Sequence, residues 1–371
     1  MSSSGFGSKF PLFAFKGIRV FVHWTFLLLV GYIAITAFLE GASPLDIGKQ
    51  VFFLLIVFLC VIMHEYGHAL MALRYGVRTK DITLLPIGGV ARLERMPEEP
   101  IQEFWITVAG PAVNLVLVAL AILLQFAFYD GLFLTDPTTS GDLGEQLLTL
   151  LLGVNLALFL FNLVPAFPMD GGRILRSVLG MRLPRLQATR IASAVGRFFA
   201  IAFVVFGLAT GRPLLALIGV FIYIGAVGEA RMAGQQAALR NVRIRQVMRS
   251  RFWSMDGQRT VSEAVDELLA GGDEDVVITH ADAYQGVVRR KALVQALQVG
   301  DREKRLDQLD MDRIPAAGPD DPAYAIYERM LASGWPLVPV VEQGRVVGVL
   351  EPTNMSEFIM VQQASAPGSG R

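Results

Sequence analysis

Long apolar runs separated by short polar segments occupy the first part of the chain. Six runs approach the roughly 20 residues of helix that the apolar core of a bilayer requires, at about 19–39, 50–73, 102–128, 147–164, 192–209 and 213–229. The last two are joined by Thr-Gly-Arg-Pro at 210–213, which is typical of a turn. The pattern predicts a multi-pass α-helical membrane domain of six transmembrane helices over 19–229, preceded by a polar segment at 1–18.

From about residue 230 onward, the apolar runs shorten to the length of strands. Two similar units follow, at about 244–299 and 306–360, and each has the pattern strand, helix, strand, strand, helix. We predict a soluble α/β domain of two repeats over 243–361, joined to the membrane domain by a linker at 230–242. The tail at 362–371, which contains Ser-Ala-Pro-Gly-Ser-Gly, is expected to be disordered.

Composition supports two environments within one chain. Of the 371 residues, 53% are hydrophobic and 18% are charged, whereas about a quarter of an average soluble protein is charged. The formal net charge is zero, which gives no bulk attraction to nucleic acid, so no nucleic-acid partner is expected. The single cysteine, Cys60, cannot form an intramolecular disulfide and implies no oxidising compartment. No signal-peptide cleavage pattern precedes the first apolar run.

Basic residues predict the orientation of the spans. Lys and Arg precede the first span, follow the second and lie between the fourth and fifth, whereas the loop at 129–146 carries four acidic residues and no basic one. Cytoplasmic loops of membrane proteins carry the excess of Lys and Arg. We therefore expect a multi-pass protein of the cell (inner or plasma) membrane. Its N-terminal segment and its C-terminal domain are both predicted to be cytoplasmic, since six spans return the chain to its starting side.

The second span ends in the sequence His64-Glu65-Tyr66-Gly67-His68. On a helix, residues four apart lie on one face, so both imidazoles can reach a single metal ion. Two neutral His ligands with a Glu between them form the zincin arrangement, in which the Glu is the general base. Polar groups near a bilayer are costly unless they serve a function, which favours a catalytic zinc site over chance.

A catalytic zinc needs a third protein ligand and an open position for water. Asp170 is the best-placed carboxylate, because it follows the fourth span in Asn-Leu-Val-Pro-Ala-Phe-Pro-Met-Asp-Gly-Gly (162–172) and is expected on the same side of the membrane as His68. Pro and Gly permit non-helical backbone at membrane depth where it lines a cavity. Two alternatives stay open: Asp170 only caps the helix that follows it, or a Glu on a later helix completes the site.

These motifs carry a resemblance to a known family. HEYGH in an early span, Ala-Gly-Pro-Ala-Val-Asn at 109–114 in the next span and the 162–172 segment resemble the site-2 protease family of intramembrane zinc metalloproteases, over about 17–229. The resemblance implies a core of three helices that carry the zinc, ligands at His64, His68 and Asp170, and a base at Glu65. It also implies cleavage of the transmembrane segments of other membrane proteins, in regulated intramembrane proteolysis. The short outer loops leave no room for the PDZ domain of other family members.

The segment at 81–100, after the HEYGH helix, contains short apolar stretches around Gly88 and Gly89. It is typical of a hairpin or a re-entrant segment, with a plain surface loop as the alternative. The resemblance implies that this element pairs with an unwound substrate as an added strand, which suits recognition of any backbone. Gly88 and Gly89 are therefore candidate substrate-binding positions.

Polar residues within the predicted spans supply further candidates. Membrane Asn residues commonly hydrogen-bond between helices, but Asn114 ends the 109–114 motif and is a candidate to orient substrate or stabilise an oxyanion. Asn162 is a second candidate for such a contact, or a brace for the segment that presents Asp170. His23, followed by Trp24, is expected to anchor the first span at the membrane interface, with a gating role as the alternative.

The C-terminal repeats resemble a tandem CBS pair, more closely in the second unit. CBS pairs often bind adenine nucleotides, and the usual cue is Thr or Ser followed by Asp after the last strand. Here the second unit has Pro-Thr-Asn at 352–354 and the first has Arg-Arg-Lys at 289–291, so the Asp is missing from both. The sequence therefore identifies no nucleotide-binding residue, and a regulatory, protein-interaction or homodimerising role is equally open.

The leading hypothesis is a zinc metalloendopeptidase whose substrate is a membrane-spanning protein. Substrate unwinds against 81–94, the zinc site activates water, and Glu65 takes a proton from the water and passes it to the leaving amine. One alternative is another membrane zincin whose third ligand is a Glu. The other is a CBS-regulated membrane transporter, which six spans and a CBS pair would fit but HEYGH does not explain.

Overall fold

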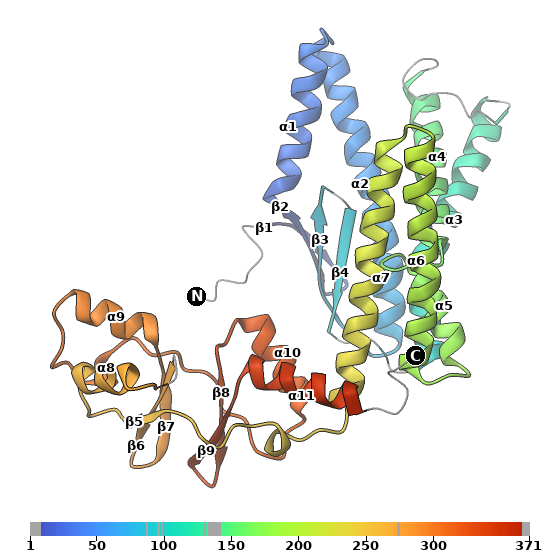
Figure 1. Ribbon diagram of the computed structural model, residues 1–371. Helices are drawn as coiled ribbons and strands as arrows, with labels where there is room; N and C mark the ends of the chain where they lie inside the picture. Colours follow the sequence, from blue (N-terminus) through green and yellow to red (C-terminus); the bar gives the residue numbers. More distant parts are fainter. Residues whose placement is uncertain are drawn as a thin grey trace. The chain divides into compact units, whose positions relative to one another are not determined.

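The computed structural model describes residues 9–86, 88–94, 97, 99–129, 131–132, 142–272 and 275–365. The chain forms two compact units, residues 1–233 and 234–371. The first contains long helices and a four-stranded sheet, and the second contains a five-stranded sheet with shorter helices (Figure 1). The predicted fold class, a multi-pass helical domain followed by a smaller α/β domain, is therefore confirmed.

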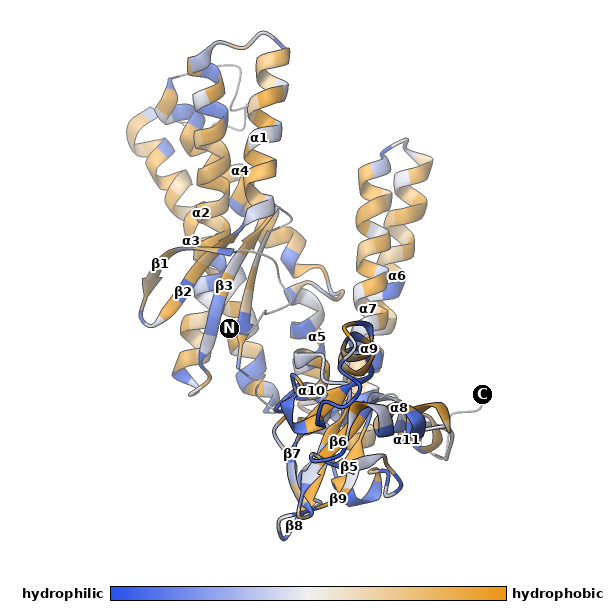
Figure 2. Cartoon of the chain, turned by 90° about the vertical axis from the view of Figure 1, so that its left-hand side faces the viewer, coloured by the Kyte–Doolittle hydropathy of each residue, from blue (hydrophilic) through white to orange (hydrophobic). Residues whose placement is uncertain are grey.

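Among the residues that the structure describes, five helices are long and apolar enough to cross a membrane (Figure 2). They are α2 (Pro44–Arg74), α3 (Pro100–Tyr129), α4 (Leu143–Leu163), α6 (Arg185–Ala209) and α7 (Pro213–Leu239). Each corresponds to one predicted span. The remaining predicted span contains α1 (Trp24–Leu39), which has 16 residues. At 1.5 Å per residue α1 is about 24 Å long, which is shorter than the roughly 30 Å of a bilayer core.

The start of the first predicted span is a strand, β2 (Ile18–His23), so the prediction of a helix from residue 19 was wrong. Ile18, Val20 and Val22 are buried, and Arg19 between them is exposed. This alternation and the β-branched side chains favour a strand. Because β2 continues directly into the apolar α1, the two elements together look like one long apolar run.

β2 belongs to a sheet with the order β1-β2-β3-β4, in which β1 is Lys9–Phe15, β3 is Thr79–Leu85 and β4 is Gly88–Leu93. β2 and β3 are parallel, and the other two pairs are antiparallel. β3 and β4 form the hairpin that was predicted within 81–100, which excludes a plain loop. The N-terminal segment, expected to be a simple polar leader to the first span, contributes β1.

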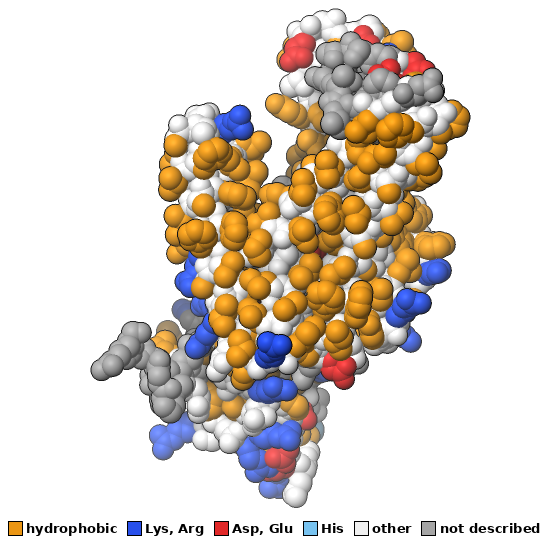
Figure 3. All heavy atoms as spheres, turned by 90° about the vertical axis from the view of Figure 1, so that its right-hand side faces the viewer, with side chains coloured by type: hydrophobic (Ala, Val, Ile, Leu, Met, Phe, Trp, Pro, Cys, Tyr) orange, Lys and Arg blue, Asp and Glu red, His pale blue; other side chains and the backbone are white. Residues whose placement is uncertain are grey.

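The first unit exposes apolar side chains and buries polar ones. Leu28, Phe128 and Leu208 are 59%, 74% and 69% exposed, whereas Asn114 and Asn155 are fully buried. Figure 3 shows apolar side chains spread over the sides of the helices, with charged side chains gathered toward the helix ends. Lipid explains this distribution, because apolar side chains are stable in contact with lipid, whereas polar groups must be satisfied inside the protein.

Two boundaries differ from the sequence prediction. α7 continues to Leu239, so most of the segment 230–242, predicted as a linker, is helical. The apolar run ends near 229, but the Ala- and Gln-rich sequence beyond it favours helix without being apolar. Likewise, α11 (Pro352–Ser365) includes the first residues of the tail predicted to be disordered. The remainder of that tail lies outside the described residues.

The second unit consists of two repeats, as predicted. The strands are β5 (Ser254–Asp256), β6 (Asp275–His280), β7 (Ala283–Arg289), β8 (Val338–Glu342) and β9 (Arg345–Leu350), in the sheet order β5-β6-β7-β9-β8. In each repeat a helix leads into an antiparallel hairpin that a second helix follows; these helices are α8 (Val261–Leu269) and α9 (Arg290–Gln298), then α10 (Ala323–Ser333) and α11. The repeats differ at their start, because the second has a single parallel bridge, Ala317–Val340, where the first has β5.

Candidate metal centre and active site

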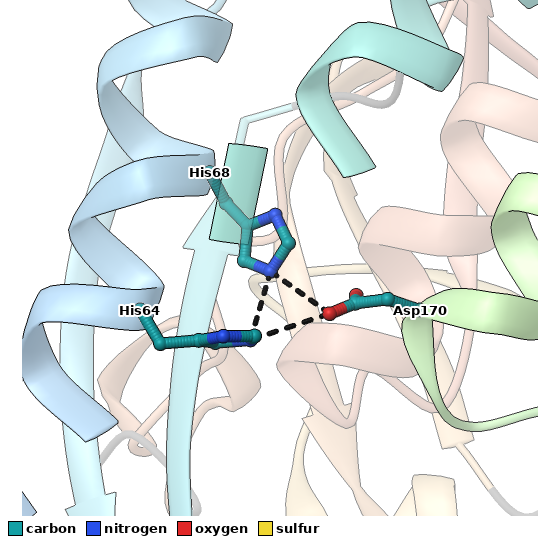
Figure 4. A group of neighbouring side chains, drawn as sticks. All are labelled: His64, His68 and Asp170. Carbon is teal, nitrogen blue, oxygen red and sulfur yellow. Dashed lines mark hydrogen bonds and ion pairs between the residues drawn. The ribbon is translucent and has the colours of Figure 1, made fainter. Parts of the chain in front are cut away.

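Three side chains of ligand type meet in the first unit (Figure 4). α2 carries His64 and His68 on one face, one turn apart, as the HEYGH spacing predicts. Asp170 is the first residue of α5 (Asp170–Gly180) and points at both imidazoles. The two Nε2 atoms lie 3.1 Å apart, and each lies 3.2 Å from Asp170 Oδ2. All three residues are buried.

The segment 164–169, between α4 and α5, leads directly into Asp170 and places it next to the two histidines. Two glycines directly after Asp170 allow α5 to begin against this segment. A Cβ on Gly171 would lie 2.2 Å from a carbonyl oxygen of the segment, and a Cβ on Gly172 would lie 2.6 Å from one of its backbone nitrogens. Met169 is the N-cap of α5 and makes no side-chain cap, so the alternative that Asp170 merely caps this helix does not hold.

A chain of hydrogen bonds sets the tautomer of His64. The Leu151 carbonyl can only accept, so the Asn155 amide donates to it at 2.8 Å. Asn155 Oδ1 therefore accepts from Asn114 Nδ2 at 2.9 Å, and Asn114 Oδ1 accepts from His64 Nδ1 at 2.5 Å. Nδ1 thus carries the proton, and Nε2 presents a lone pair toward Asp170.

α3 holds His68 in the same tautomer. His68 Nδ1 donates to the Ile106 carbonyl at 2.8 Å, which leaves the lone pair on Nε2. Gly110, one turn further along α3, makes room for the ring, because a Cβ at this position would lie 2.2 Å from His68 Nε2. The position and the tautomer of the second histidine therefore both depend on α3.

This donor set requires a positive charge between its members. Two imidazole lone pairs and a carboxylate oxygen face one another, and they repel unless a proton or a metal ion lies among them. Zinc bonds of about 2.0–2.1 Å at tetrahedral angles place neighbouring ligand atoms roughly 3.3–3.4 Å apart. The observed separations of 3.1–3.2 Å are close to this spacing. The three residues therefore fit a zinc ion without rearrangement of the backbone.

The side chain of Glu65 extends from α2 to the edge of the four-stranded sheet. Its Oε2 accepts the backbone N–H of Ala91 at 3.2 Å, so the outer edge of β4 borders the site. Gly89 makes this approach feasible, because a Cβ there would lie 2.9 Å from Glu65 Cγ. The carboxylate is thus held beside the metal ligands by a backbone donor rather than by another side chain.

Most of the predicted site residues line one cavity of about 370 Å³. Its lining includes His64, Glu65, His68, Asp170, Gly88, Gly89 and Asn162. Asn162 is half-buried and makes no side-chain hydrogen bond with the residues that the structure describes. Its amide is therefore free to contact a molecule in the cavity.

Two other predicted candidates lie elsewhere. Asn114 is fully buried, and its two polar ends bond His64 and Asn155, so the prediction that it contacts substrate or an oxyanion was wrong. It orients a ligand instead. His23 is the N-cap of α1, where its Nδ1 accepts the N–H of Thr25 at 3.3 Å, and it does not line the cavity.

Sequence reasoning missed the part that α3 plays. Gly110 and Asn114 are four residues apart on that helix, so they lie on one face, and they contact His68 and His64 in turn. The spacing within the 109–114 motif was a signal for this arrangement. Gly67 packs α2 against α3, because a Cβ there would lie 2.6 Å from Ala109 O.

Comparisons with known proteins show the family of this chain. Residues 52–142 and 136–203 match the model of peptidase family M50. A zinc metalloprotease of Methanocaldococcus jannaschii is 31% identical over 346 residues, which cover 93% of this chain and 94% of that protein. The chain belongs to the site-2 protease family. This site-2 protease is also similar to Rip3 of Mycobacterium tuberculosis, with 29% identity over 96% of this chain and 94% of that protein.

The solved structure of a site-2 protease from M. jannaschii is 35% identical and covers 60% of this chain and 96% of that one, with a TM-score of 0.45. Residues 307–360 match the model of the CBS domain. The protein is therefore an intramembrane zinc metalloprotease with a C-terminal CBS pair. Family membership sets aside the alternative of a transporter.

Proposed function

We propose that His64, His68 and Asp170 hold one catalytic zinc ion and that Glu65 is the general base for hydrolysis of a peptide bond. The bond lies in or near the transmembrane segment of another membrane protein. The observation that carries this proposal is the triangle of two Nε2 atoms and one carboxylate oxygen, 3.1–3.2 Å on each side. Both Nδ1 atoms are bonded to oxygen acceptors, so both Nε2 lone pairs are available to a metal.

Zinc, when bound there, supplies a Lewis acid that makes water nucleophilic near neutral pH and polarises a carbonyl. Glu65 takes a proton from the attacking water and delivers it to the leaving amine. Its hydrogen bond from Ala91 N–H holds the carboxylate at the cavity. Asn155, Asn114 and Ile106 keep the two imidazoles in the tautomer that a metal needs.

Substrate enters as an extended strand along the outer edge of β4. β4 pairs with β3 alone among the described strands, and on its other edge the Ala91 N–H donates to Glu65, so a further strand has the rest of that edge to pair with. Gly88 and Gly89 lie on this strand and line the cavity, where small residues allow a substrate backbone to approach closely. Main-chain hydrogen bonds of this kind accept many sequences.

Asn162 contacts the substrate carbonyl that is attacked. Its amide is on the cavity wall together with Asp170, and it has no other partner in the part of the chain that the structure describes. An amide donor aimed at a developing oxyanion typically contributes a factor of about 10²–10³ in rate. We expect Asn162→Ala to lose that factor while the zinc content stays unchanged.

We place the N-terminal segment, the metal centre and the CBS pair on the cytoplasmic side of the cell membrane. Lys and Arg precede α1 and follow α2, and the loop on the opposite side is acidic. Cleavage therefore occurs near the cytoplasmic face of the membrane. The substrate helix must unwind there, because a protease acts on an extended backbone.

Two variants test the assignment of base and ligand. Glu65→Gln keeps the shape of the side chain and every metal ligand, so we expect wild-type zinc content and loss of cleavage by a factor of about 10²–10⁴. Asp170→Ala removes a ligand, so we expect loss of both zinc and cleavage. Zinc is measured in the purified protein, and cleavage is measured on a co-expressed single-span protein that the wild type cuts.

Opposite results would identify what is wrong. Retained cleavage in Glu65→Gln would overturn the role of the base. If Asp170→Ala kept both its zinc and its cleavage activity, another carboxylate would have to be the third ligand, as in zincins that use a Glu. Asp46→Asn is the matched control, because Asp46 is an exposed carboxylate on α2 whose side-chain contacts are with Ser43 and Lys49 at the far end of the helix.

We propose that the CBS pair is a regulatory or interaction module. α7 contains Phe221, which lines the cavity, and runs without a break to Leu239, which is buried in the core of the second unit. A ligand that rearranges this core therefore acts on a helix that also borders the site. ATP is the first probe, and a change in cleavage rate on its addition would support the proposal. An unchanged rate, with no ATP bound, would favour a protein partner or a second copy of the chain.

A further inference from the structure

A cluster of four acidic and basic side chains, two of them buried and two half-buried, lies outside the cavity lining. Its members come from four helices: Glu103 of α3, Arg176 of α5, Arg185 of α6 and Glu229 of α7. Two carboxylates and two guanidinium groups leave the cluster without formal net charge. None of the four lines the cavity, so none is placed to contact substrate.

Arg176 is the centre of this cluster. Its Nε donates to Glu103 Oε1 at 2.8 Å, its Nη2 donates to the same oxygen, and its Nη1 donates to Glu229 Oε1. Arg185 Nη1 lies 3.6 Å from the second oxygen of Glu103. Arg176 and Glu103 are only 4% and 2% exposed. Apolar residues often replace a buried ion pair without loss of stability, so stability alone does not explain a pair that is buried this deeply.

The cluster contacts the segment that carries Asp170. Arg176 lies in the second turn of the helix that Asp170 begins, and its guanidinium group lies 5.2 Å from the centre of the Phe167 ring. α7 presses on the same segment, because a Cβ on Gly225 would lie 2.7 Å from Pro168 Cδ. Glu229 is one turn beyond Gly225 on the same face of α7. Arg176 therefore holds the Asp170 segment against α7.

The same cluster contacts the helix that supports His68. Glu103 is three residues before Ile106, whose carbonyl receives the His68 Nδ1 proton, and seven residues before Gly110, which contacts the ring. All three lie on one buried face of α3. The Arg176–Glu103 contact thus sets the separation of α3 from α5. That separation reaches His68, which lies on α2, through its contacts with the Ile106 carbonyl and Gly110 of α3.

We infer that Arg176 is a positioning residue for the metal centre, which acts through Glu103 and Phe167 to hold Asp170 in reach of His68. The inference rests on the proposed zinc site. Metal ligands must be held within about 0.5 Å of their productive geometry. Loss of a group that orients a ligand typically weakens metal binding 10- to 100-fold.

The test compares three variants of the full-length protein in detergent. Arg176→Lys keeps the charge, but one ammonium group cannot bond both carboxylates and lie over Phe167. The double variant Glu103→Leu/Arg176→Met removes the central pair together, so neither charge is left buried without its partner. Arg190→Met is the matched control, because Arg190 is an exposed arginine on α6 for which the described residues provide no ion pair.

Zinc dissociation constants are measured by competition with a chelator, and cobalt-substituted protein reports ligand geometry through its visible absorption. We expect zinc affinity to fall 10- to 100-fold in Arg176→Lys and in the double variant, with altered cobalt bands and with unchanged values for Arg190→Met. Wild-type zinc affinity and cobalt bands in a folded double variant would overturn the inference. If the double variant does not fold, Arg176→Lys decides by the same criterion.

The wild type and Asp170→Ala separate this inference from the zinc site itself. If the wild type binds zinc, Asp170→Ala does not, and the Arg176 variants bind zinc as the wild type does, only the positioning role of Arg176 is overturned. A wild type whose zinc content does not depend on Asp170 would overturn the proposed metal centre, and the inference about Arg176 with it.

Discussion

The two units of this chain distribute polar and apolar side chains in opposite ways. In the first unit, Leu28 and Phe128 face outward, while Asn114, Glu103 and Arg176 are buried. In the second unit the described buried core is apolar. Every buried polar or charged side chain among the described residues belongs to the first unit. A lipid environment accepts apolar side chains outside, so the interior becomes available for polar groups that hold a metal.

This difference separates the consequences of mutation in the two units. Inside the first unit, a substitution should damage the metal centre more than the fold, because lipid contacts and helix hydrogen bonds remain. Inside the second unit, a substitution should damage the fold and leave the metal centre intact, because apolar burial is the main source of its stability. Three variants test this contrast, and a fourth measures a buried charge of the first unit that lies away from the metal centre.

Gly110→Ala should have the largest effect. The added Cβ would lie 2.2 Å from His68 Nε2, a distance that no real contact allows, so the ligand ring must move. We expect zinc affinity to fall by more than about 100-fold, beyond the effect of losing an orienting group, and cleavage to be lost. Gly153→Ala is the control, since a Cβ at Gly153 of α4 meets no atom within 4 Å. Equal zinc binding by the two variants would contradict the close packing of α3 on His68.

Met330→Ala tests the apolar interior of the second unit. Met330 is fully buried in the larger core of this unit, so truncation should cost about 2–5 kcal/mol of unfolding free energy. Denaturant unfolding of the second unit should report that loss, and zinc content should not change. Leu331→Ala, at a neighbouring residue that is 56% exposed, should cost far less. Loss of zinc in Met330→Ala would show that the two units are less independent than this comparison assumes.

Asn114→Leu should weaken zinc binding 10- to 100-fold, because the His64 Nδ1 proton loses its acceptor while the size of the side chain is kept. The measurement is the same chelator competition. Leu115→Ala controls for a substitution elsewhere on the same helix, since Leu115 is 49% exposed. An unchanged affinity would mean that the tautomer of His64 is set by the metal alone.

The smallest effect should appear at Asp81, a buried polar residue of the sheet that lies outside the cavity lining. Burial raises the pKa of Asp81, but hydrogen bonds from Arg92 and Lys9 outweigh it and lower the pKa to about 2. Because the pKa of Asp81 is lower in the folded than in the unfolded state, its ionised carboxylate stabilises the fold at pH values above the unfolded-state pKa near 4. This stabilisation is lost as the pH falls toward 2. The loss should be at most about 1 kcal/mol, since Arg92 is half-exposed.

Thermal unfolding of the zinc-free protein between pH 5 and pH 2 measures this contribution. Asp81→Asn should be less stable than the wild type at pH 5, and the two should converge toward pH 2. A constant difference across that range would exclude the ionised carboxylate as its source. Zinc-free protein is needed, because acid would also release the metal.

Local spacing accounts for the predictions that were confirmed. Helical periodicity alone places His64 and His68 on one face, and the repeats of the second unit follow from alternating runs of strand and helix length. The strand β2 was missed because its apolar residues merge with those of α1. The last turns of α7 were missed because hydropathy reports contact with lipid and not helix formation.

The sequence by itself determined the family, the pair of histidines, the neighbouring Glu65 and the division into a lipid-facing and a water-facing unit. These depend on residues close together along the chain. Only the tertiary structure decided that Asp170, 102 residues after His68, lies 3.2 Å from it, that Asn114 orients His64, and that Arg176 bridges Glu103 and Glu229. Such contacts depend on how closely whole helices approach one another, and that approach is set by packing around glycines and buried charges distant in the sequence.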